Sequence, residues 1–187
     1  NVSENNGDRK EHVYKNRDRI ATAFGFTRKR LILLKQRQKD DILILKDPVE
    51  TIPSFLEYDA LITNVSNILL GIRTADCIPI FVVDQKRKVI AAVHAGRRGT
   101  ALHITKKVLK KMEEEFVSTS EDLIIALGPS IGPCCYEIDE KVFLSIWKPF
   151  SMPKGRGRWM VDIARINIAQ MKNEGIKEEQ IFQVDLC

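Results

Sequence analysis

Short apolar runs, rich in β-branched residues and separated by polar turns, recur along this chain and predict strands. The strands are expected at residues 30–36, 41–46, 59–63, 68–73, 78–84, 88–94, 122–127 and 181–186. Only the polar turn 84–87 joins the strands at 78–84 and 88–94. A connection this short favours an antiparallel hairpin, so these two strands are expected to lie side by side.

Apolar residues at helical spacing predict helices between the strands. The helices are expected at residues 11–24, 99–116, 139–147 and 162–174. Gly25 and Gly175 follow the first and the last of them and are typical helix stops. The Gly/Pro-rich stretch 128–133 is predicted to be a loop, and the basic stretch 151–158 is predicted to be an exposed loop.

Strands therefore outnumber helices, and hairpins are mixed with crossover connections. This pattern is typical of an α+β domain with a mixed sheet rather than of a regular βαβ repeat. The length of 187 residues suits a single domain, and no internal repeat divides the chain. Neither a G-x-G-x-x-G segment after a strand nor a P-loop is present, so the two common nucleotide-phosphate motifs are excluded.

The charge of the chain changes this picture only slightly. The formal net charge is +5, but the basic residues are spread out, and aromatic residues make up only 7% of the chain. They do not alternate with basic residues as a nucleic-acid stacking surface would require, so we expect no nucleic-acid partner. A positive field does suit a small anionic substrate such as phosphate.

The apolar runs and the cysteines indicate the compartment. No run approaches the roughly 20 apolar residues of a membrane helix, and residues 1–8 do not resemble a secretory signal. The four cysteines, Cys77, Cys134, Cys135 and Cys187, form no C-x-x-C zinc pattern, and a chain of this size does not need disulfides. We therefore expect a soluble, cytoplasmic protein without a membrane partner.

Cys77 and His94 are the candidate catalytic pair. Cys77 begins the first strand of the predicted hairpin, and His94 ends the second. An antiparallel pairing brings both side chains to the open end of the hairpin. A thiolate is both a nucleophile and a soft metal ligand, and a neutral imidazole can act as a base or as a second ligand. His12 and His103 lie on predicted helices among polar residues and are expected to be solvated.

The residues after His94 are suited to binding an anion. Gly96 and Gly99 would let a substrate approach the backbone, and the predicted helix begins here with free N–H groups. Arg98 adds a guanidinium with several donors. A single cysteine or histidine is usually structural, but the two together, beside glycines and arginines, favour a functional site.

These residues also carry a resemblance to a known family. Residues 74–79 read T-A-D-C-I-P, and residues 94–99 read H-A-G-R-R-G. They resemble the T-A-D-C-x-P and H-A-G-W-R-G segments of the YfiH/YlmD laccase-domain family, with Arg97 in place of the tryptophan. Residues 128–138, G-P-S-I-G-P-C-C-Y-E-I, resemble its G-P-A-I-G-P-C-C-Y-E-V loop, and Asn16-Arg17 resembles its N-R pair. The resemblance covers nearly the whole chain, which lacks the family's first segment and stops at Cys187, where the family continues.

The resemblance implies a layered α/β/β/α fold, similar to that of the cytotoxic necrotizing factor deamidases. It also implies phosphorolysis of purine nucleosides such as adenosine, inosine and methylthioadenosine, with adenosine deaminase activity. The family's metal is usually zinc, or copper in older descriptions, and is held by two histidines and one cysteine. Cys77 and His94 match two of these ligands, and Gln38 stands where the family has the other histidine. A glutamine amide is a poor zinc ligand.

The leading hypothesis is therefore a zinc-dependent purine nucleoside phosphorylase. Arg17 and Arg98 would hold phosphate, and Asp76 would orient a metal ligand. The alternatives are a metal-free hydrolase that uses Cys77 and His94, and a non-catalytic member that binds a nucleoside or a protein partner. A copper oxidase is disfavoured, because three histidines in the whole chain are too few for several copper sites.

Overall fold

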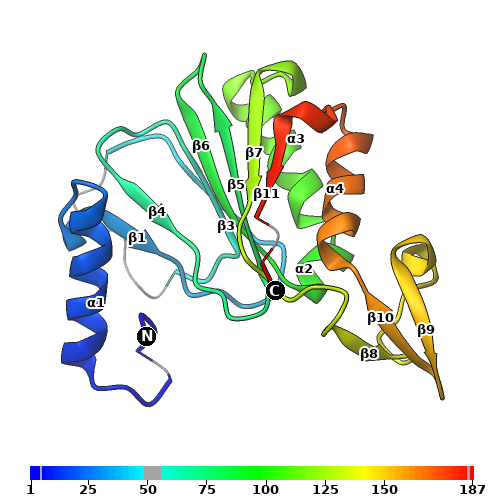
Figure 1. Cartoon of the computed structure of the whole chain (residues 1–187). Coiled ribbons are helices and arrows are strands. Elements are labelled where there is room, and N and C mark those ends of the chain that lie inside the picture. Colours follow the sequence, from blue (N-terminus) through cyan, green and yellow to red (C-terminus); the bar gives the residue numbers. More distant parts are fainter. Residues whose placement is uncertain (5, 49–55, 185) are drawn as a thin grey trace.

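The structure is a computed structural model that describes residues 1–4, 6–48, 56–184 and 186–187. Within this part of the chain, the largest sheet has six strands in the order β11-β7-β5-β6-β3-β2 (Figure 1). In chain order its strands are β2 (Ile42–Leu45), β3 (Ala60–Thr63), β5 (Ile78–Asp84), β6 (Val89–Ala95), β7 (Leu123–Leu127) and β11 (Ile181–Gln183). The outer pairs β11–β7 and β3–β2 are parallel and the inner pairs are antiparallel, so the sheet is mixed, as the sequence predicted.

The main core lies between this sheet and the helices on one of its faces. These helices are α2 (Arg97–Ala101), α3 (Ile104–Phe116) and α4 (Ile163–Asn173). Alternate residues of the central strands, such as Ile80 and Val82 of β5, point into this core and are fully buried. They pack with the apolar face of α3, where Val108 and Met112 are also fully buried. Side chains on one face recur every second residue along a strand and every three to four residues along a helix, so these apolar positions face one another.

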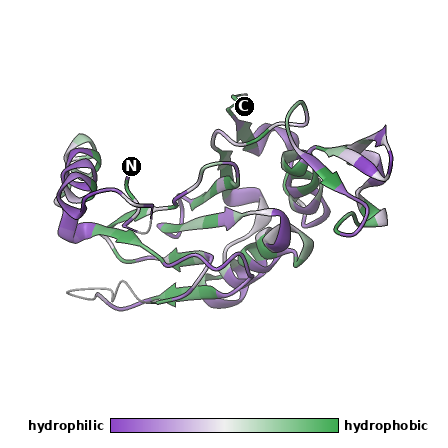
Figure 2. Ribbon diagram, turned by 90° about the horizontal axis from the view of Figure 1, so that it is seen from below, coloured by the Kyte–Doolittle hydropathy of each residue, from purple (hydrophilic) through white to green (hydrophobic). Residues whose placement is uncertain are grey.

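A small second sheet covers part of the opposite face. It pairs β1 (Leu31–Leu33) with β4 (Leu69–Gly71) in parallel, and the helix α1 (Lys10–Ala23) lies outside it (Figure 1). Ile32 and Leu34 pack against Leu61 of the main sheet and form a separate apolar cluster. Figure 2 shows α1 as largely hydrophilic and the strands of the sheets as largely hydrophobic. The layers are therefore α/β/β/α, and the predicted fold class is confirmed.

A third sheet corrects two of the sequence predictions. Its strands are β8 (Glu137–Asp139), β9 (Ser151–Gly155) and β10 (Arg158–Val161), in the order β8-β10-β9. The predicted exposed loop at 151–158 is therefore mostly a hairpin. Its turn residues Arg156 and Gly157 have φ angles of 51° and 70°. Two central residues with positive φ are typical of the tight turns that join the strands of a hairpin. The glycines and basic residues of this segment are the reason that the sequence alone predicted a loop.

The other predicted element in this region was also wrong. Residues 139–147 were expected to form a helix, but the regular turns begin later, as the 3-10 helix Ser145–Phe150. Trp147 in this segment is almost fully buried, and the rings of Phe143 and Trp159 stack with centroids 4.2 Å apart. Packing of aromatic side chains onto the third sheet, rather than helix propensity, sets the conformation here.

The predicted helix at 99–116 is divided into α2 and α3. His103 separates them with a left-handed backbone, at φ 59° and ψ 41°. A left-handed residue ends an α-helix, and for a residue other than glycine it costs about 1–2 kcal/mol. The break redirects the chain so that α3 can place Ile104 and Val108 in the core. His103 is exposed, as expected, and so is His12.

The remaining elements agree with the predictions within a few residues. The helices α1 and α4 end close to Gly25 and Gly175, and both glycines have positive φ angles, of 76° and 85°. Asp162 caps α4 by accepting a hydrogen bond from the backbone N–H of Arg165. Within the described residues, the structure contains no helix long and apolar enough to span a membrane.

Candidate functional site

The register of the central hairpin brings Cys77 and His94 together. In the β5–β6 pair, Pro79 lies opposite His94 and Ile78 lies opposite Ala95, so Cys77 sits at the end of the ribbon. Both side chains reach Gly96, the residue before α2: a Cβ atom added there would lie 2.9 Å from the Cys77 sulfur and 3.7 Å from Cε1 of His94. The sulfur and the imidazole thus converge where the sequence placed them.

Asp59 is the residue that orients His94. Its side chain is fully buried at the start of β3, and its Oδ1 lies 2.8 Å from Nδ1 of His94. A backbone hydrogen bond also joins the two residues: the N–H of His94 donates to the carbonyl oxygen of Asp59 at 2.8 Å. A carboxylate on Nδ1 keeps the proton on that nitrogen and leaves Nε2 free to face a partner.

Backbone N–H groups of the loop before β2 hold Asp59 in turn. Arg37 donates to Oδ2 at 3.1 Å, Gln38 donates to Oδ1 at 2.9 Å, and Lys39 donates to Oδ2 at 2.8 Å. Gln38 has a φ of 56°, which turns three successive N–H groups toward one carboxylate. Burial alone raises the pKa of Asp59, but the hydrogen bonds from His94 and from these N–H groups lower it overall.

The same contacts set the charge of His94. Burial on its own lowers the pKa of the imidazole, but its interactions with Asp59 and Cys77 outweigh burial and raise that pKa to about 9. Without a metal, the ring is therefore protonated at neutral pH. The site then consists of the Asp59 carboxylate, the His94 imidazolium and the Cys77 sulfur in series, which is an arrangement suited to holding one proton donor in a fixed direction.

Tyr136 interacts electrostatically with Arg97 and with Cys77, and neither Tyr136 nor Arg97 was expected from the sequence to act at the site. Burial raises the pKa of the Tyr136 phenol, the charge of Arg97 opposes that rise, and Cys77 and Asp76 add to it. The Tyr136 phenol therefore interacts electrostatically with the side chains of Arg97, Cys77 and Asp76. The position of Tyr136 in the sequence could have indicated this. It ends the loop 128–136, which follows β7, and β7 pairs with the strand β5 that begins after Cys77.

Two of the predicted residues lie at the edge of the site. Arg98 and Asp76 are both exposed. The carbonyl oxygen of Asp76 accepts a hydrogen bond from the N–H of Ile131 at 2.9 Å, which ties the segment before Cys77 to the loop 128–136. The carboxylate that contacts His94 in the structure is that of Asp59, and the orienting role expected for Asp76 stays a prediction.

Arg17 lies elsewhere in the fold. Its guanidinium donates to the carbonyl oxygen of Val2 at 2.9 Å and to Glu4 Oε1 at 2.7 Å. It lines a largely apolar cavity of about 470 Å³ between α1, the small sheet and the main sheet. Neither Cys77 nor His94 is among the residues described as lining that cavity. The phosphate-binding role of Arg17 remains a prediction that these contacts do not support.

The donor atoms fit the expected metal only in part. Cys77 and the free Nε2 of His94 are good zinc ligands, and Asp59 supplies the carboxylate that such histidines commonly contact. Gln38 is exposed and offers only an amide, although its backbone N–H is tied to Asp59. The structure therefore brings the side chains of Cys77 and His94 together, and the metal-binding role of Gln38 stays a prediction.

Comparisons with known proteins agree with this description. The profile of the family described as multi-copper polyphenol oxidoreductase laccase matches residues 1–187. A relative named purine nucleoside phosphorylase from Bacteroides thetaiotaomicron is 30% identical over 200 aligned positions, covering 100% of this chain and 74% of the relative. Another with that name, from Clostridium acetobutylicum, is 44% identical over 108 residues, covering 58% of this chain and 44% of the relative. This chain thus spans less than half of the second relative.

A solved structure gives the same result for the fold. The crystal structure of the hypothetical protein YfiH from Bacillus licheniformis superposes with a TM-score of 0.91 at 25% identity. The superposition covers 100% of this chain and 75% of that structure. The arrangement of layers around Cys77 and His94 is therefore that of known structures.

Proposed function

The chain belongs to the multi-copper polyphenol oxidoreductase laccase family, and from this we propose that it is a purine nucleoside phosphorylase. Two relatives that carry this name support the proposal, one of them aligned with the whole chain. The structural observation that supports it most is the series from Asp59 through His94 to Cys77. Oxidase chemistry with several coppers is not supported, because the chain has only three histidines and two of them are exposed and distant in sequence from Cys77.

In the proposed reaction, a phosphate oxygen forms a bond to the anomeric carbon of the ribose while the bond from that carbon to the purine nitrogen breaks. The purine leaves with the electron pair and takes up a proton, and ribose 1-phosphate forms. The transition state has oxocarbenium character, so placing the anion matters more than a strong base. Arg97 and Arg98, in the first turn of α2, are the cations nearest in sequence to His94 for this purpose.

Asp59 and Gly96 prepare the site. Asp59 keeps the proton on Nδ1 of His94 and so directs Nε2 toward Cys77. Gly96 leaves the space beside the sulfur open, which a methyl group would fill. Cys77 and His94 would hold a zinc ion, with Gln38 as a weak third ligand. Zinc bound there would supply positive charge to orient and activate the phosphate.

The direct test is to incubate the purified chain with inosine or adenosine, with and without phosphate and zinc, and to measure the free base by chromatography. We expect base release that depends on phosphate and is lost in Cys77→Ser and His94→Ala. His12→Ala is the matched control, because it removes an exposed histidine of α1. No release of base under any of these conditions would refute the proposal.

Metal analysis addresses the zinc separately. With two strong ligands and one amide, we expect zinc to be removed by mild chelation and to be regained on addition of excess zinc. Gln38→His would restore a third strong ligand and should tighten zinc binding by at least about tenfold, the scale on which ligand environments change metal affinity. Equal affinity in the two proteins would show that Gln38 does not lie at the metal.

One observation favours a metal-free hydrolase as the second candidate. The order carboxylate, imidazole, thiol also occurs in cysteine hydrolases, where the base is oriented by a third group. In that case Cys77 should react with iodoacetamide at neutral pH, and the reaction should slow in His94→Ala. An inert Cys77 in the zinc-free protein would contradict this candidate.

A further inference from the structure

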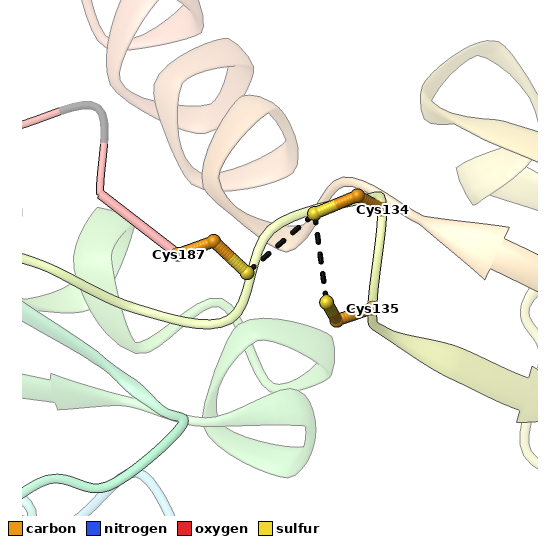
Figure 3. Close-up of side chains that lie close together, drawn as sticks. All are labelled: Cys134, Cys135 and Cys187. Carbon is orange, nitrogen blue, oxygen red and sulfur yellow. Dashed lines mark hydrogen bonds between the residues drawn. The ribbon is translucent and has the colours of Figure 1, made fainter.

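A second group of sulfur atoms lies outside the site described above. The sulfurs of Cys134 and Cys135 are 3.6 Å apart, and those of Cys134 and Cys187 are 3.5 Å apart. All three lie within 4.8 Å of one another. Figure 3 shows Cys134 between the other two, with Cys187 arriving from a different segment of the chain. These two segments are more than 50 residues apart in sequence, so the tertiary structure brings the sulfurs together.

The backbone holds the two segments in place. β11 pairs in parallel with β7, and the chain after each strand continues toward the same side. The N–H of Ser130 then donates to the carbonyl oxygen of Leu186 at 3.3 Å. Within the loop 128–136, the N–H of Cys135 donates to the carbonyl oxygen of Gly132 at 3.1 Å, which folds the adjacent cysteines into a turn. The cluster is therefore part of the fold's hydrogen-bond framework.

The sulfur separations fit a shared metal ion better than a disulfide. A disulfide bond is about 2.05 Å long, far below the 3.5 Å and 3.6 Å found here. Zinc–sulfur bonds of about 2.3 Å in a tetrahedral site place two sulfurs about 3.8 Å apart. The observed separations are close to that edge length, so small rotations of three side chains would complete the geometry.

The electrostatics of the cluster favour a cation. The N–H of Gly132 donates to the Cys187 sulfur at 3.2 Å, and this bond, helped by Cys134 and Cys135, lowers the pKa of the Cys187 thiol. Hydrogen bonds with Cys134 and Cys187 raise the pKa of Cys135 to about 11, and repulsion from those two neighbouring sulfurs adds to the rise. A bound cation would remove that repulsion and let all three thiols lose their protons.

We propose that Cys134, Cys135 and Cys187 form a three-thiolate site for a borderline-soft divalent cation such as zinc, separate from the Cys77–His94 site. Thiolate ligands select such cations over the hard ones. All three side chains are exposed, so solvent can fill the fourth position. Binding releases the thiol protons to solvent. The ion would join the loop 128–136, which carries Tyr136 into the candidate active site, to the chain that follows β11.

Cobalt(II) is the probe for this site, because tetrahedral thiolate coordination gives intense visible bands and a sulfur-to-metal charge-transfer band. The experiment uses the reduced, metal-free Cys77→Ser variant without oxygen, so that the other site lacks its thiolate. We expect one cobalt ion with these bands, displaced by zinc. Adding Cys134→Ser, Cys135→Ser or Cys187→Ser singly should weaken binding by at least about tenfold, the size of loss that even an outer contact of a metal site causes.

The outcomes separate this proposal from the proposed function. Thiolate bands that persist in the combined Cys134→Ser, Cys135→Ser and Cys187→Ser variant would overturn it, and so would no bands in Cys77→Ser. A protein that binds no cobalt but loses 2 Da in air, through a Cys134–Cys187 disulfide, would overturn it as well. Phosphorolysis does not enter these readouts, so an inactive protein that binds cobalt through the three cysteines still supports the site.

Discussion

Replacing Asp59 with asparagine is the most informative perturbation of the candidate site. The carboxylate is fully buried and contacts four donors. Oδ2 faces the N–H groups of Arg37 and Lys39, at 3.1 Å and 2.8 Å, and Oδ1 faces the N–H of Gln38 at 2.9 Å and Nδ1 of His94 at 2.8 Å. Asparagine has the same shape, but one of its two terminal atoms is an NH₂ group that cannot accept.

The expected loss follows from these contacts. If the NH₂ group takes the Oδ2 position, the N–H of Lys39 faces a donor and the N–H of Arg37 keeps only its 3.2 Å contact with Oδ1. If it takes the Oδ1 position, the N–H of Gln38 faces a donor, while His94 can change tautomer and accept. Each buried donor left without a partner costs about 1–3 kcal/mol. Asp59→Asn should therefore lower the free energy of unfolding by about 2–4 kcal/mol, and the freed imidazole should lose its fixed direction.

Urea unfolding followed by tryptophan fluorescence measures this loss, and the phosphorolysis assay follows the site. We expect a lower urea midpoint for Asp59→Asn and a fall in activity larger than the unfolded fraction explains. Glu57→Gln is the matched control, since Glu57 lies two residues away and its ion pairs with the described residues Lys35 and Arg37 are exposed. An Asp59→Asn midpoint equal to that of the wild type would refute the assigned role of this carboxylate.

Three further predictions follow from other contacts. Gly96→Ala places a methyl group 2.9 Å from the Cys77 sulfur, so the rate of phosphorolysis should fall by about a hundredfold, and an unchanged rate would contradict the assigned position of the thiol. Burial raises the pKa of Asp84, but hydrogen bonds from Arg87 help to lower it below the usual 3.8, so its contribution to stability is present above pH 3.8 and is lost as the pH falls through the lower folded value. Acid unfolding should show this loss, and Asp84→Asn should flatten it; an equal slope in both proteins would argue against it. Asn167→Ala removes fully buried hydrogen bonds and should lower the free energy of unfolding by about 2–3 kcal/mol in thermal scans, whereas Asn173→Ala, on the exposed face of the same helix, should not; similar melting of both variants would disprove this.

Features that depend on neighbouring residues could be predicted from the sequence. The hairpin of β5 and β6 follows from two apolar runs and one short polar turn, and its register places Cys77 beside His94. The glycines after α1 and α4 mark helix ends because a left-handed residue there is easiest for glycine. The pair Cys77–His94 is therefore a local consequence of the chain, because the two residues are only one hairpin apart.

The tertiary structure alone decided the contacts between distant segments. Asp59 reaches His94 because β3 pairs with β6, and Cys187 reaches Cys134 because β11 pairs with β7. Apolar periodicity shows which face of a strand is buried, but not which strand lies next to it, since many pairings bury the same face. The break at His103 and the hairpin of β9 and β10 also depend on packing that outweighs local propensity. The sequence by itself thus determined that Cys77 and His94 meet and where most elements lie, and the packing of the sheets determined the positions of the Asp59 carboxylate and of the three clustered sulfurs.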